Sequence, residues 1–431
     1  MQLSLSIFRI LCFPGVGLSQ VSILPKIVQI DSPQTHSIDP MSLPLPLITN
    51  SAKHKSQEIR QPPDATLNVP KGFTVNIFAS GDPPNVFQKP RQMILAPNGD
   101  IFLSDTDVDG KVYVLRDHEM DGVADERFTF ASGLIKPYGL AFNNGFLYVA
   151  TTHSVVRFPY QFGDTRASAD PETVVPLTED DEGHTTRDIK FSLDGSEFFV
   201  GVGSSGDVLA AVGSTGDSLV EGDPLRAAIS VYNVSGTDRQ TFASGIRNPA
   251  SLAVNPVNGE LWTTAAERNG FGEDLIPDYA TSVKEGGFYG YPYSYIGKNP
   301  DPRFAHDRPD LVDQGIVPDV LFIAHSAPLG MTFYNGTMFP KEYQGDAFVA
   351  LHGSSDRQEL TGYKVVRIKF DNGKLVKNEY EDFLTGWLSS PDDNKVWGRP
   401  VAVAVAGDGA LLISDDGAKK IWRISYCGDK C

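Results

Sequence analysis

Histidine and arginine side chains recur just before short hairpin-forming stretches of this sequence. One such group, Gly-His-Thr-Thr-Arg, contains His184 and Arg187, and another places Arg247 next to Asn248. Neutral histidine can take a proton near pH 7, and arginine presents planar paired donors that suit carboxylates. We therefore expect a site for an anionic, oxidisable ligand. Further candidates stand beside later stretches: His325, His352, Arg357, Trp397 and Arg399.

A repeated pattern positions these groups: two short apolar stretches joined by a tight turn that contains Asn or Gly. Both residues tolerate the positive φ angles that two-residue hairpin loops require. Most copies are followed by a further alternating strand, and this repetition is typical of a propeller. Six copies predict six hairpins, over residues 92–104, 138–150, 188–202, 251–264, 330–351 and 400–414.

The predicted fold class is all-β, a six-bladed β-propeller. The copies recur at intervals of roughly 60 residues, more than the ~45 of minimal propeller repeats. We therefore expect long loops on the active face, where equivalent positions of different blades converge around the axis. The alternative architecture is an array of β-sandwiches.

The chain of 431 residues divides into an N-terminal part and one large domain. Residues 1–30 carry apolar stretches that resemble an export signal interrupted by Arg9, and Met41 offers a second start. Residues 31–70 are rich in Pro, Ser and Gln, and we interpret residues 1–70 as an export signal and a poorly ordered linker. Residues 71–431 are predicted to form the propeller, in a periplasmic or secreted protein.

The net charge of the chain limits the kinds of molecule it is expected to bind, and its cysteines limit the disulfides it can form. The formal net charge of −17 argues against nucleic acid and anionic membranes. No later stretch approaches the ~20 apolar residues that span a bilayer, so no membrane insertion of the propeller is expected. Of the three cysteines, Cys12, Cys427 and Cys431, the last two either close a small disulfide loop or stay free thiols.

Two acidic stretches, from Asp105 to Asp109 and from Asp117 to Asp125, resemble the beginning of calcium loops. Neither is an EF-hand, because the twelfth positions are Arg116 and Phe128 rather than Glu. Two alternatives stay open: structural Ca²⁺ between strands, or acidic turns in solvated loops.

Motifs between about Gly72 and Tyr426 resemble those of the soluble quinoprotein glucose/sorbosone dehydrogenase family, and most closely its L-sorbosone dehydrogenase-like branch. They follow the family's order and are specific jointly rather than singly: GHTTR (183–187), SGIRNP (244–249), AERNG (266–270), DLIPDY (274–279), GGFYGYP (286–292), AHSAPLG (324–330), TGYKVVR (361–367) and WGRPV (397–401). The resemblance implies a six-bladed propeller, in agreement with the repeat count. It also implies binding of pyrroloquinoline quinone and Ca²⁺ and oxidation of an aldose or sugar aldehyde.

The resemblance also implies roles for single residues. His184 matches the catalytic base, which takes the hydroxyl proton at the anomeric carbon while hydride moves to the quinone. Main-chain carbonyls of the loop Glu267, Arg268, Asn269 and Gly270 match the Ca²⁺ ligands, since hard oxygens suit that ion. An external quinone, dye or cytochrome would then accept the electrons. The residues expected to bind the cofactor are Arg187, Arg247, Asn248, His325, Arg357, Trp397 and Arg399.

Two departures from the glucose-oxidising branch leave the sugar open. Gly183 stands where that branch has an acid, so Glu182 or another group would orient the base, and Arg357 stands where it has Lys. Structural alternatives remain for His184 as a surface-loop residue, for Arg247 as a salt bridge between blades, and for packing or structural roles at the other candidates. The alternative functions are a Ca²⁺-dependent sugar lactonase and a non-catalytic binding propeller.

Overall fold

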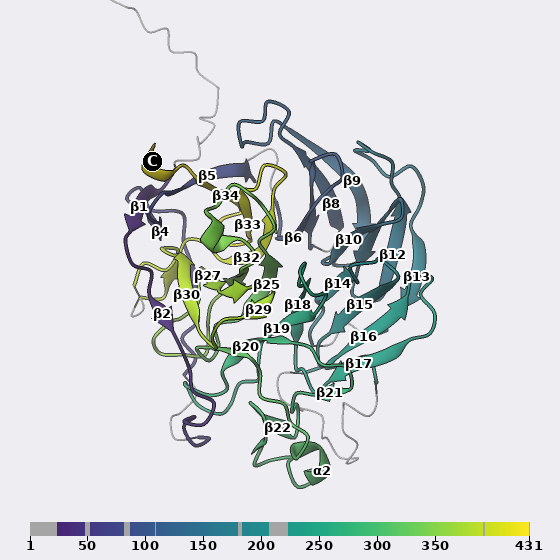
Figure 1. The fold of residues 1–431 in the computed structure, drawn as a ribbon, viewed down its shortest axis with the longest axis vertical. Helices are drawn as coiled ribbons and strands as arrows, with labels where there is room; N and C mark the ends of the chain where they lie inside the picture. Colours follow the sequence, from purple (N-terminus) through teal and green to yellow (C-terminus); the bar gives the residue numbers. More distant parts are fainter. Residues whose placement is uncertain are drawn as a thin grey trace, which may run out of the picture.

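The chain forms a ring of six antiparallel sheets around a central axis, and the predicted six-bladed β-propeller is confirmed (Figure 1). The structure, a computed structural model, describes residues 24–47, 52–81, 87–107, 109–179, 183–206, 223–390 and 393–430. Residues 1–23, which carry the start of the predicted export signal, and Glu182 lie outside this description.

Each blade contains four antiparallel strands that follow one another from the axis outward; residues Gly287–Phe288 add a parallel edge strand to blade 3, and residues Thr35–His36 add an antiparallel one to blade 5. The innermost strands are β6 (Pro90–Leu95), β10 (Leu140–Asn143), β14 (Arg187–Phe191), β18 (Pro249–Val254), β25 (Pro328–Phe333) and β32 (Pro400–Val405). The second strands are β7 (Ile101–Asp105), β11 (Phe146–Ala150), β15 (Glu197–Val202), β19 (Leu261–Ala265), β26 (Ala347–Leu351) and β33 (Leu411–Asp415). The third strands are β8 (Gly110–Arg116), β12 (Ser154–Pro159), β16 (Ala228–Asn233), β20 (Asp278–Ser282), β27 (Lys364–Ile368) and β34 (Lys420–Tyr426). The outer strands are β9 (Glu126–Leu134), β13 (Glu172–Pro176), β17 (Gln240–Ser244), β24 (Val320–Phe322), β30 (Tyr380–Leu384) and β5 (Phe73–Ser80).

Several short strands and helices occur in addition to the four main strands of each blade. An extension between β20 and β24 contains β21, β22, β23 and α2, and Figure 1 shows β22 and α2 beyond the edge of the ring, below β21. The short elements after β5 are β21 (Gly287–Phe288), β22 (Ser294–Tyr295), β23 (Asn299–Pro300), α2 (Pro309–Val312), η1 (Lys341–Tyr343), β28 (Phe370–Asp371), β29 (Lys374–Leu375), β31 (Lys395–Val396) and η2 (Gly428–Lys430).

All six innermost hairpins lie where the repeats predict them. At the tip of the second blade, Asn143 pairs with Phe146, so the turn has two central residues. These are Asn144 and Gly145, with φ angles of 46° and 76°. Two positive φ angles characterise the type I′ turn, whose twist matches that of the adjoining strands. The fifth hairpin is looser, because η1 lies between β25 and β26.

The innermost strand of each blade begins at the edge of the ring where the second strand ends. In the third blade Arg187 pairs with Val202, and in the fourth Pro249 pairs with Ala265. Residues that precede an innermost strand therefore share one face of the ring with residues that follow a second strand. We call this the site face, since the candidate histidines and arginines gather on it.

Strand β5 closes the ring. It pairs antiparallel with β34, so a strand from the beginning of the domain completes the last blade (Figure 1). At this junction Phe73 is fully buried, and its ring meets those of four aromatic residues edge-on at centroid distances of 4.8 to 5.2 Å: Phe339, Tyr343, Phe383 and Tyr426.

The segment before β5 differs from the expected linker. Strand β1 (Lys26–Ile30) pairs in parallel with β4 (Thr66–Pro70), β2 (Thr35–His36) pairs with β30, and β3 (Gln57–Glu58) pairs with β31. Main-chain hydrogen bonds hold these strands to the outside of the propeller, and such bonds need no alternating apolar pattern. Composition alone therefore gave no sign of this order.

An ionic cluster fastens β2 to blade 5. Asp382 Oδ1 lies 3.0 Å from His36 Nε2 and 2.6 Å from Lys364 Nζ. Burial raises the pKa of Asp382, but the bonds from His36 and Lys364 outweigh it and hold that pKa below its usual 3.8. A depressed carboxyl pKa stabilises the fold above the unfolded-state pKa, and the stabilisation is lost as pH falls through the folded-state value.

We expect Phe73→Ala to lower the free energy of unfolding by about 3–5 kcal/mol, because it leaves a cavity among packed rings at the closure of the ring. Urea denaturation followed by tryptophan fluorescence measures this. The matched control is Phe162→Ala, since Phe162 is 77% exposed. Equal effects of the two substitutions would contradict the packing argument.

The Asp382 cluster predicts a pH-dependent loss. Asp382→Asn should lower the free energy of unfolding by about 2 kcal/mol at pH 7, where the carboxylate accepts charged donors. The difference from wild type should shrink toward pH 3, as the native carboxyl takes up its proton. Denaturation at several pH values tests this, with the exposed Asp170→Asn as control. A difference that stays constant with pH would refute it.

Candidate active site

His184 lies in the loop that leads into β14, with its ring held against the end of β15. The main-chain oxygen of Ser204 lies 2.9 Å from His184 Nδ1 and 3.1 Å from the His184 amide nitrogen. A carbonyl oxygen only accepts hydrogen bonds, so Nδ1 carries the proton in this contact. In the neutral ring the basic lone pair is then on Nε2. The fold thereby selects one tautomer of a ring that can act as a proton acceptor.

Asn248 lies beside His184, and both pack against Gly203. A Cβ atom at position 203 would lie 2.5 Å from Asn248 Oδ1 and 2.6 Å from His184 Cβ. Only glycine leaves room for both side chains. Asn248 is 7% exposed, and its Oδ1 is buried without a hydrogen-bond partner in the described part of the chain. A buried amide oxygen in this state is one that a ligand could satisfy.

Gly183 explains the missing acid before the base. Its φ angle is 67°, and a Cβ there would lie 2.3 Å from the carbonyl carbon of Ser205 and 2.6 Å from the carbonyl oxygen of Ser204. No side chain fits in this position. Among the described residues, the orienting contact to the ring comes instead from the Ser204 carbonyl.

Arg187 is placed differently from the expectation that it binds a cofactor. It is fully buried, and its Nη1 donates to the carbonyl oxygens of His184, at 2.6 Å, and Thr186, at 2.9 Å. Its Nη2 donates to Thr178 Oγ1 at 2.8 Å. The guanidinium therefore positions the main chain of the His184 loop from below. The residue type of Arg187 and its spacing from His184 predicted a cation near the site, but they did not predict which way the side chain points.

Arg247 joins the start of β18 to the loop after β19. Its Nη1 donates to the carbonyl oxygen of Ala266 at 2.9 Å. The next two residues, Glu267 and Arg268, form a buried ion pair of 3.0 Å, and Arg268 Nε lies 3.1 Å from Asp301 Oδ2. The charged side chains of this loop are thus paired within the protein. What the loop, with Gly270 at its exposed end, can offer a cation is main-chain oxygen.

Asp278 and His325 brace this loop from the other side. Asp278 accepts the amide of Glu267 at 2.7 Å and the amide of Ala327 at 2.7 Å. His325 Nδ1 lies 2.8 Å from Asn269 Oδ1, and its Nε2 lies 3.1 Å from the carbonyl oxygen of Gly272. Both ring nitrogens of His325 therefore bond the loop, and we assign His325 to positioning rather than to cofactor contact.

Sequence reasoning underrated Asp278. Its burial raises the pKa of the carboxyl to about 7, because a charged carboxylate is poorly solvated inside the protein. Asp278 lies beneath the loop 267–270, and the signal that could have revealed this is its place at the start of a buried strand in the motif DLIPDY.

A second network crosses blades 1, 5 and 6. His352 Nε2 lies 2.9 Å from Asp416 Oδ1, and Arg91 Nη2 lies 3.1 Å from Asp416 Oδ2. Burial raises the pKa of Asp416, but His352 and Arg91 outweigh it and hold that pKa well below its usual value. Burial lowers the pKa of His352, because the charged imidazolium is poorly solvated inside the protein. Arg91 was missed from the sequence because no histidine or motif stands beside it.

Arg399 lies at the edge of this network, 21% exposed. Its Nε lies 3.4 Å from the carbonyl oxygen of His352, and its Nη1 lies 3.5 Å from Glu58 Oε1 of strand β3. These contacts are long, so the guanidinium is loosely held compared with that of Arg187. It remains suited to a carboxylate ligand on the site face.

Two other expected cofactor contacts are engaged within the protein. Arg357 Nη1 donates to the carbonyl oxygen of Glu273 at 2.5 Å and to Asp274 Oδ1 at 2.8 Å, which ties the loops of blades 4 and 5 together. Trp397 is 3% exposed, packs against Trp387 and Trp422, and donates Nε1–H to the carbonyl oxygen of Gly386 at 2.8 Å. Trp397 is therefore a packing residue, because a large apolar ring is most stable in the core.

The acidic stretches of blade 1 behave as turns. Asp105 accepts the amides of Gln88 and Lys89, and Asp117 accepts the amide of Gly122 at 2.8 Å. Across the described ranges, no three His, Cys, Asp or Glu side chains are grouped so that they could hold a metal ion. This favours the turn interpretation over a structural Ca²⁺ site made of these side chains.

Two predictions about the chain ends and the membrane can be compared with the structure. Cys427 is disulfide-bonded. Residues 12 and 431 lie outside the described residues, so the pairing of Cys427 with Cys431 stays a prediction. No helix in the described ranges is long and apolar enough to cross a membrane.

Comparison with known proteins identifies the family and several relatives of the chain. An uncharacterized protein of Borreliella burgdorferi is 27% identical over 376 residues, covering 84% of this chain and 91% of that protein. The calcium structure of a family AA12 carbohydrate-active enzyme from Trichoderma reesei superposes with a TM-score of 0.71 at 19% identity, covering 86% of this chain and 100% of that one. The holo form of the pyranose dehydrogenase PQQ domain from Coprinopsis cinerea gives a TM-score of 0.68 at 18% identity, covering 85% and 98%. Residues 67–303 and 311–426 match the family model described as TrAA12-like, so the family resemblance is confirmed and the chain belongs to the TrAA12-like family.

Proposed function

We propose that the protein is a pyrroloquinoline quinone-dependent dehydrogenase that oxidises an aldose or sugar aldehyde, with Ca²⁺ as a second cofactor. The observation that carries the proposal is the bond from His184 Nδ1 to the Ser204 carbonyl, which puts the basic lone pair of the neutral ring on Nε2, in a side chain that packs with Asn248 against Gly203. Family membership and the pyranose dehydrogenase PQQ domain among the structural neighbours support it.

The residues of the site face fit the quinone. Its carboxylates suit the guanidinium of Arg399, whose contacts with the protein are long, and that of Arg357, which would have to share its donors with Glu273 and Asp274. The ring oxygens of the quinone accept hydrogen bonds and suit two donors, the guanidinium of Arg247 and the Nδ2 group of Asn248. The Oδ1 of Asn248, buried without a partner among the described residues, can accept only from a donor such as a substrate hydroxyl. When bound, pyrroloquinoline quinone supplies the acceptor for the hydride that leaves the substrate carbon.

The loop of Glu267, Arg268, Asn269 and Gly270 fits Ca²⁺. Its side-chain charges are neutralised within the protein, Asp278 fixes its main chain at the Glu267 amide, and His325 holds the side chain of Asn269. Fixed carbonyl oxygens are the ligands that this hard cation prefers. A calcium structure occurs among the structural neighbours, which supports the proposal.

The proposed proton path uses one side chain. His184 Nε2 accepts the hydroxyl proton at the carbon to be oxidised, and Nδ1–H stays bonded to Ser204, so the ring cannot turn away as it becomes charged. The Ser204 carbonyl also stabilises the imidazolium, because a carbonyl dipole favours the charged form. Arg187 beneath the loop holds this geometry through the His184 and Thr186 carbonyls.

Turnover requires an external electron acceptor such as a quinone, dye or cytochrome, and a periplasmic or secreted location suits such an enzyme. We do not pursue a Ca²⁺-dependent lactonase, since no cluster of metal-ligating side chains occurs in the described ranges. A non-catalytic propeller is disfavoured by the coordinated fixing of His184, Asn248 and the loop after β19.

Reconstitution tests the proposal. Purified protein should gain dye-linked aldose oxidation when pyrroloquinoline quinone and Ca²⁺ are added. His184→Ala should lower kcat about 10²–10⁴-fold, the usual contribution of a general base, while the affinity for the quinone, measured by absorbance titration, changes little. The exposed His118→Ala is the control. Absence of activity with every aldose and absence of a spectral shift on quinone addition would refute the proposal.

The packing around Gly203 gives a second test. Gly203→Ala should lower kcat/KM up to about 10²-fold, because a displacement of about 1 Å between base and bound substrate is costly. The control is Gly407→Ala, where the nearest atom to a new Cβ is 3.8 Å away. Circular dichroism and thermal melting verify that both variants fold. Unchanged kinetics in Gly203→Ala would show that the His184–Asn248 alignment does not matter.

A further inference from the structure

A second feature of the site face is a cavity of about 330 Å³ between blades 1, 2 and 3. Its lining includes three cationic side chains, Lys89, Arg91 and Lys136, and one carboxylate, Asp107. Thr185 and Thr186, the two residues directly after His184, line its other side. The lining therefore continues the loop that carries the proposed base, and it comes from blades 1 to 3, whereas the loop after β19 belongs to blade 4.

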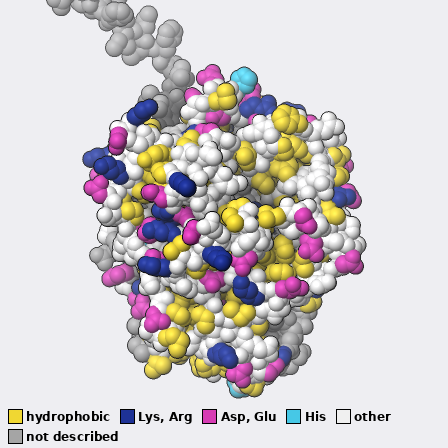
Figure 2. Space-filling view, viewed as in Figure 1, with side chains coloured by type: hydrophobic (Ala, Val, Ile, Leu, Met, Phe, Trp, Pro, Cys, Tyr) yellow, Lys and Arg dark blue, Asp and Glu magenta, His cyan; other side chains and the backbone are white. Residues whose placement is uncertain are grey.

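The charge of this cavity contrasts with that of the protein. The chain carries a formal net charge of −17, and acidic and basic side chains are interspersed over the surface drawn in Figure 2. Three cations against one lining carboxylate is therefore a local reversal of sign. Arg91 also has a buried Nε with no hydrogen-bond partner among the described residues, although its Nη2 pairs with Asp416. Donors in a partly enclosed cavity attract anions more strongly than donors in open water.

The remaining lining is polar and suits a sugar. Thr186 and Thr185 present hydroxyl groups, which can donate to and accept from sugar hydroxyls. The main chain of Thr185 is itself fixed, because its carbonyl oxygen accepts from Thr152 Oγ1 at 3.3 Å. A hexose whose anomeric carbon lies at His184 could extend its far end along these residues toward the lysines.

We propose that this cavity is a subsite for an anionic group of the substrate, so that the preferred substrate is an aldose carrying a carboxylate or phosphate distant from its anomeric carbon. The inference rests on the proposed function, since it takes His184 as the base. Lys89 and Lys136 bind the anionic group, Arg91 contributes positive potential, and Thr185 and Thr186 contact the sugar hydroxyls.

The test compares three probes that differ only at the far end: D-glucose, D-glucuronate and D-glucose 6-phosphate. The holoprotein should give a higher kcat/KM for at least one anionic sugar than for glucose, through a lower KM. Lys89→Gln and Lys136→Gln should each reduce that preference about tenfold, because each removes one hydrogen bond to a charged group. Raising the salt from about 0.05 M to about 0.5 M should reduce it as well.

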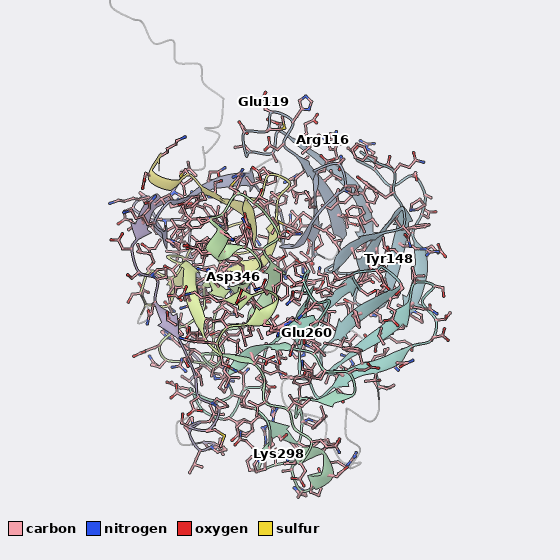
Figure 3. All side chains as sticks on the ribbon, viewed as in Figure 1. Arg116, Glu119, Tyr148, Glu260, Lys298 and Asp346 are labelled. Atoms are coloured by element: carbon pink, nitrogen blue, oxygen red, sulfur yellow. The ribbon has the colours of Figure 1, made fainter. Side chains whose placement is uncertain are left out.

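The control variant is Lys298→Gln, an exposed lysine in the extension beyond the ring, far from its centre (Figure 3). It removes the same charge and should leave the preference unchanged. A comparison of kcat/KM for D-glucuronate and D-glucose 6-phosphate identifies whether the subsite takes a carboxylate or a phosphate. Calorimetric titration of each sugar into the protein without an electron acceptor gives a readout independent of turnover.

The outcomes separate the subsite from the proposed function. Lysine-dependent binding of an anionic sugar without turnover of any aldose would support the subsite and refute the dehydrogenase. Turnover of glucose with no preference for either anionic sugar would support the dehydrogenase and overturn the subsite. Lysine variants that weaken the affinity for pyrroloquinoline quinone, with the sugar preference unchanged, would also overturn it, because the cavity would then hold cofactor carboxylates.

Discussion

The hydrogen bonds of Ser204 fix the relative position of two blades and of the groups they carry. Its carbonyl oxygen accepts from the amide and Nδ1 of His184 in blade 3, and its amide donates to the carbonyl oxygen of Arg247 at 2.8 Å, at the start of blade 4. One residue at the end of a second strand thus holds the proposed base and the proposed quinone contacts in register. On the Ser204 side these bonds use main-chain atoms, so they depend on the strand pairing of the blades; the Ser204 hydroxyl adds a contact of 3.2 Å to His184 Nδ1.

The arginines of the site face differ in burial and in what they bond. Arg187 and Arg268 are at most 1% exposed and donate to carbonyl, hydroxyl and carboxylate oxygens of the protein. Arg247, 6% exposed, bonds a main-chain carbonyl and is also a proposed quinone contact. Arg399 is 21% exposed, and its contacts to protein are long. Burying a guanidinium costs free energy unless protein oxygens accept its hydrogen bonds. Arg187 and Arg268 therefore bond the protein rather than a ligand. Burial thus distinguishes Arg187 and Arg268 from Arg399, although all three are arginines of the site face.

The sequence predicted the ring because turn chemistry is local. Asn144 and Gly145 specify a hairpin without reference to any other blade, and the same holds for each repeat. The site was predictable only as far as motif and strand position: His184 and Asn248 were expected on one face, and Gly203 brings them together. The role of Arg91 was not predictable, because its partner Asp416 is far away in the chain. The direction of Arg187 and the packing of Trp397 involve nearer residues but depend on the loop conformations that the fold gives them.

The N-terminal segment, which its composition marks as a linker, is hydrogen-bonded to loops of the candidate site. Leu47 donates its amide to Phe271 at 2.8 Å, His54 to Ser355 at 3.0 Å and Ile59 to Val396 at 2.8 Å. These acceptors lie in three loops of blades 4, 5 and 6 that carry, or directly adjoin, proposed ligand residues. A buried amide or carbonyl group without a hydrogen-bond partner is unfavourable. Each of these bonds satisfies one group of the segment and one group of a loop, so the segment and the loops stabilise one another. The segment thus acts on the geometry of the site face, although it contributes no strand to the interior of any blade.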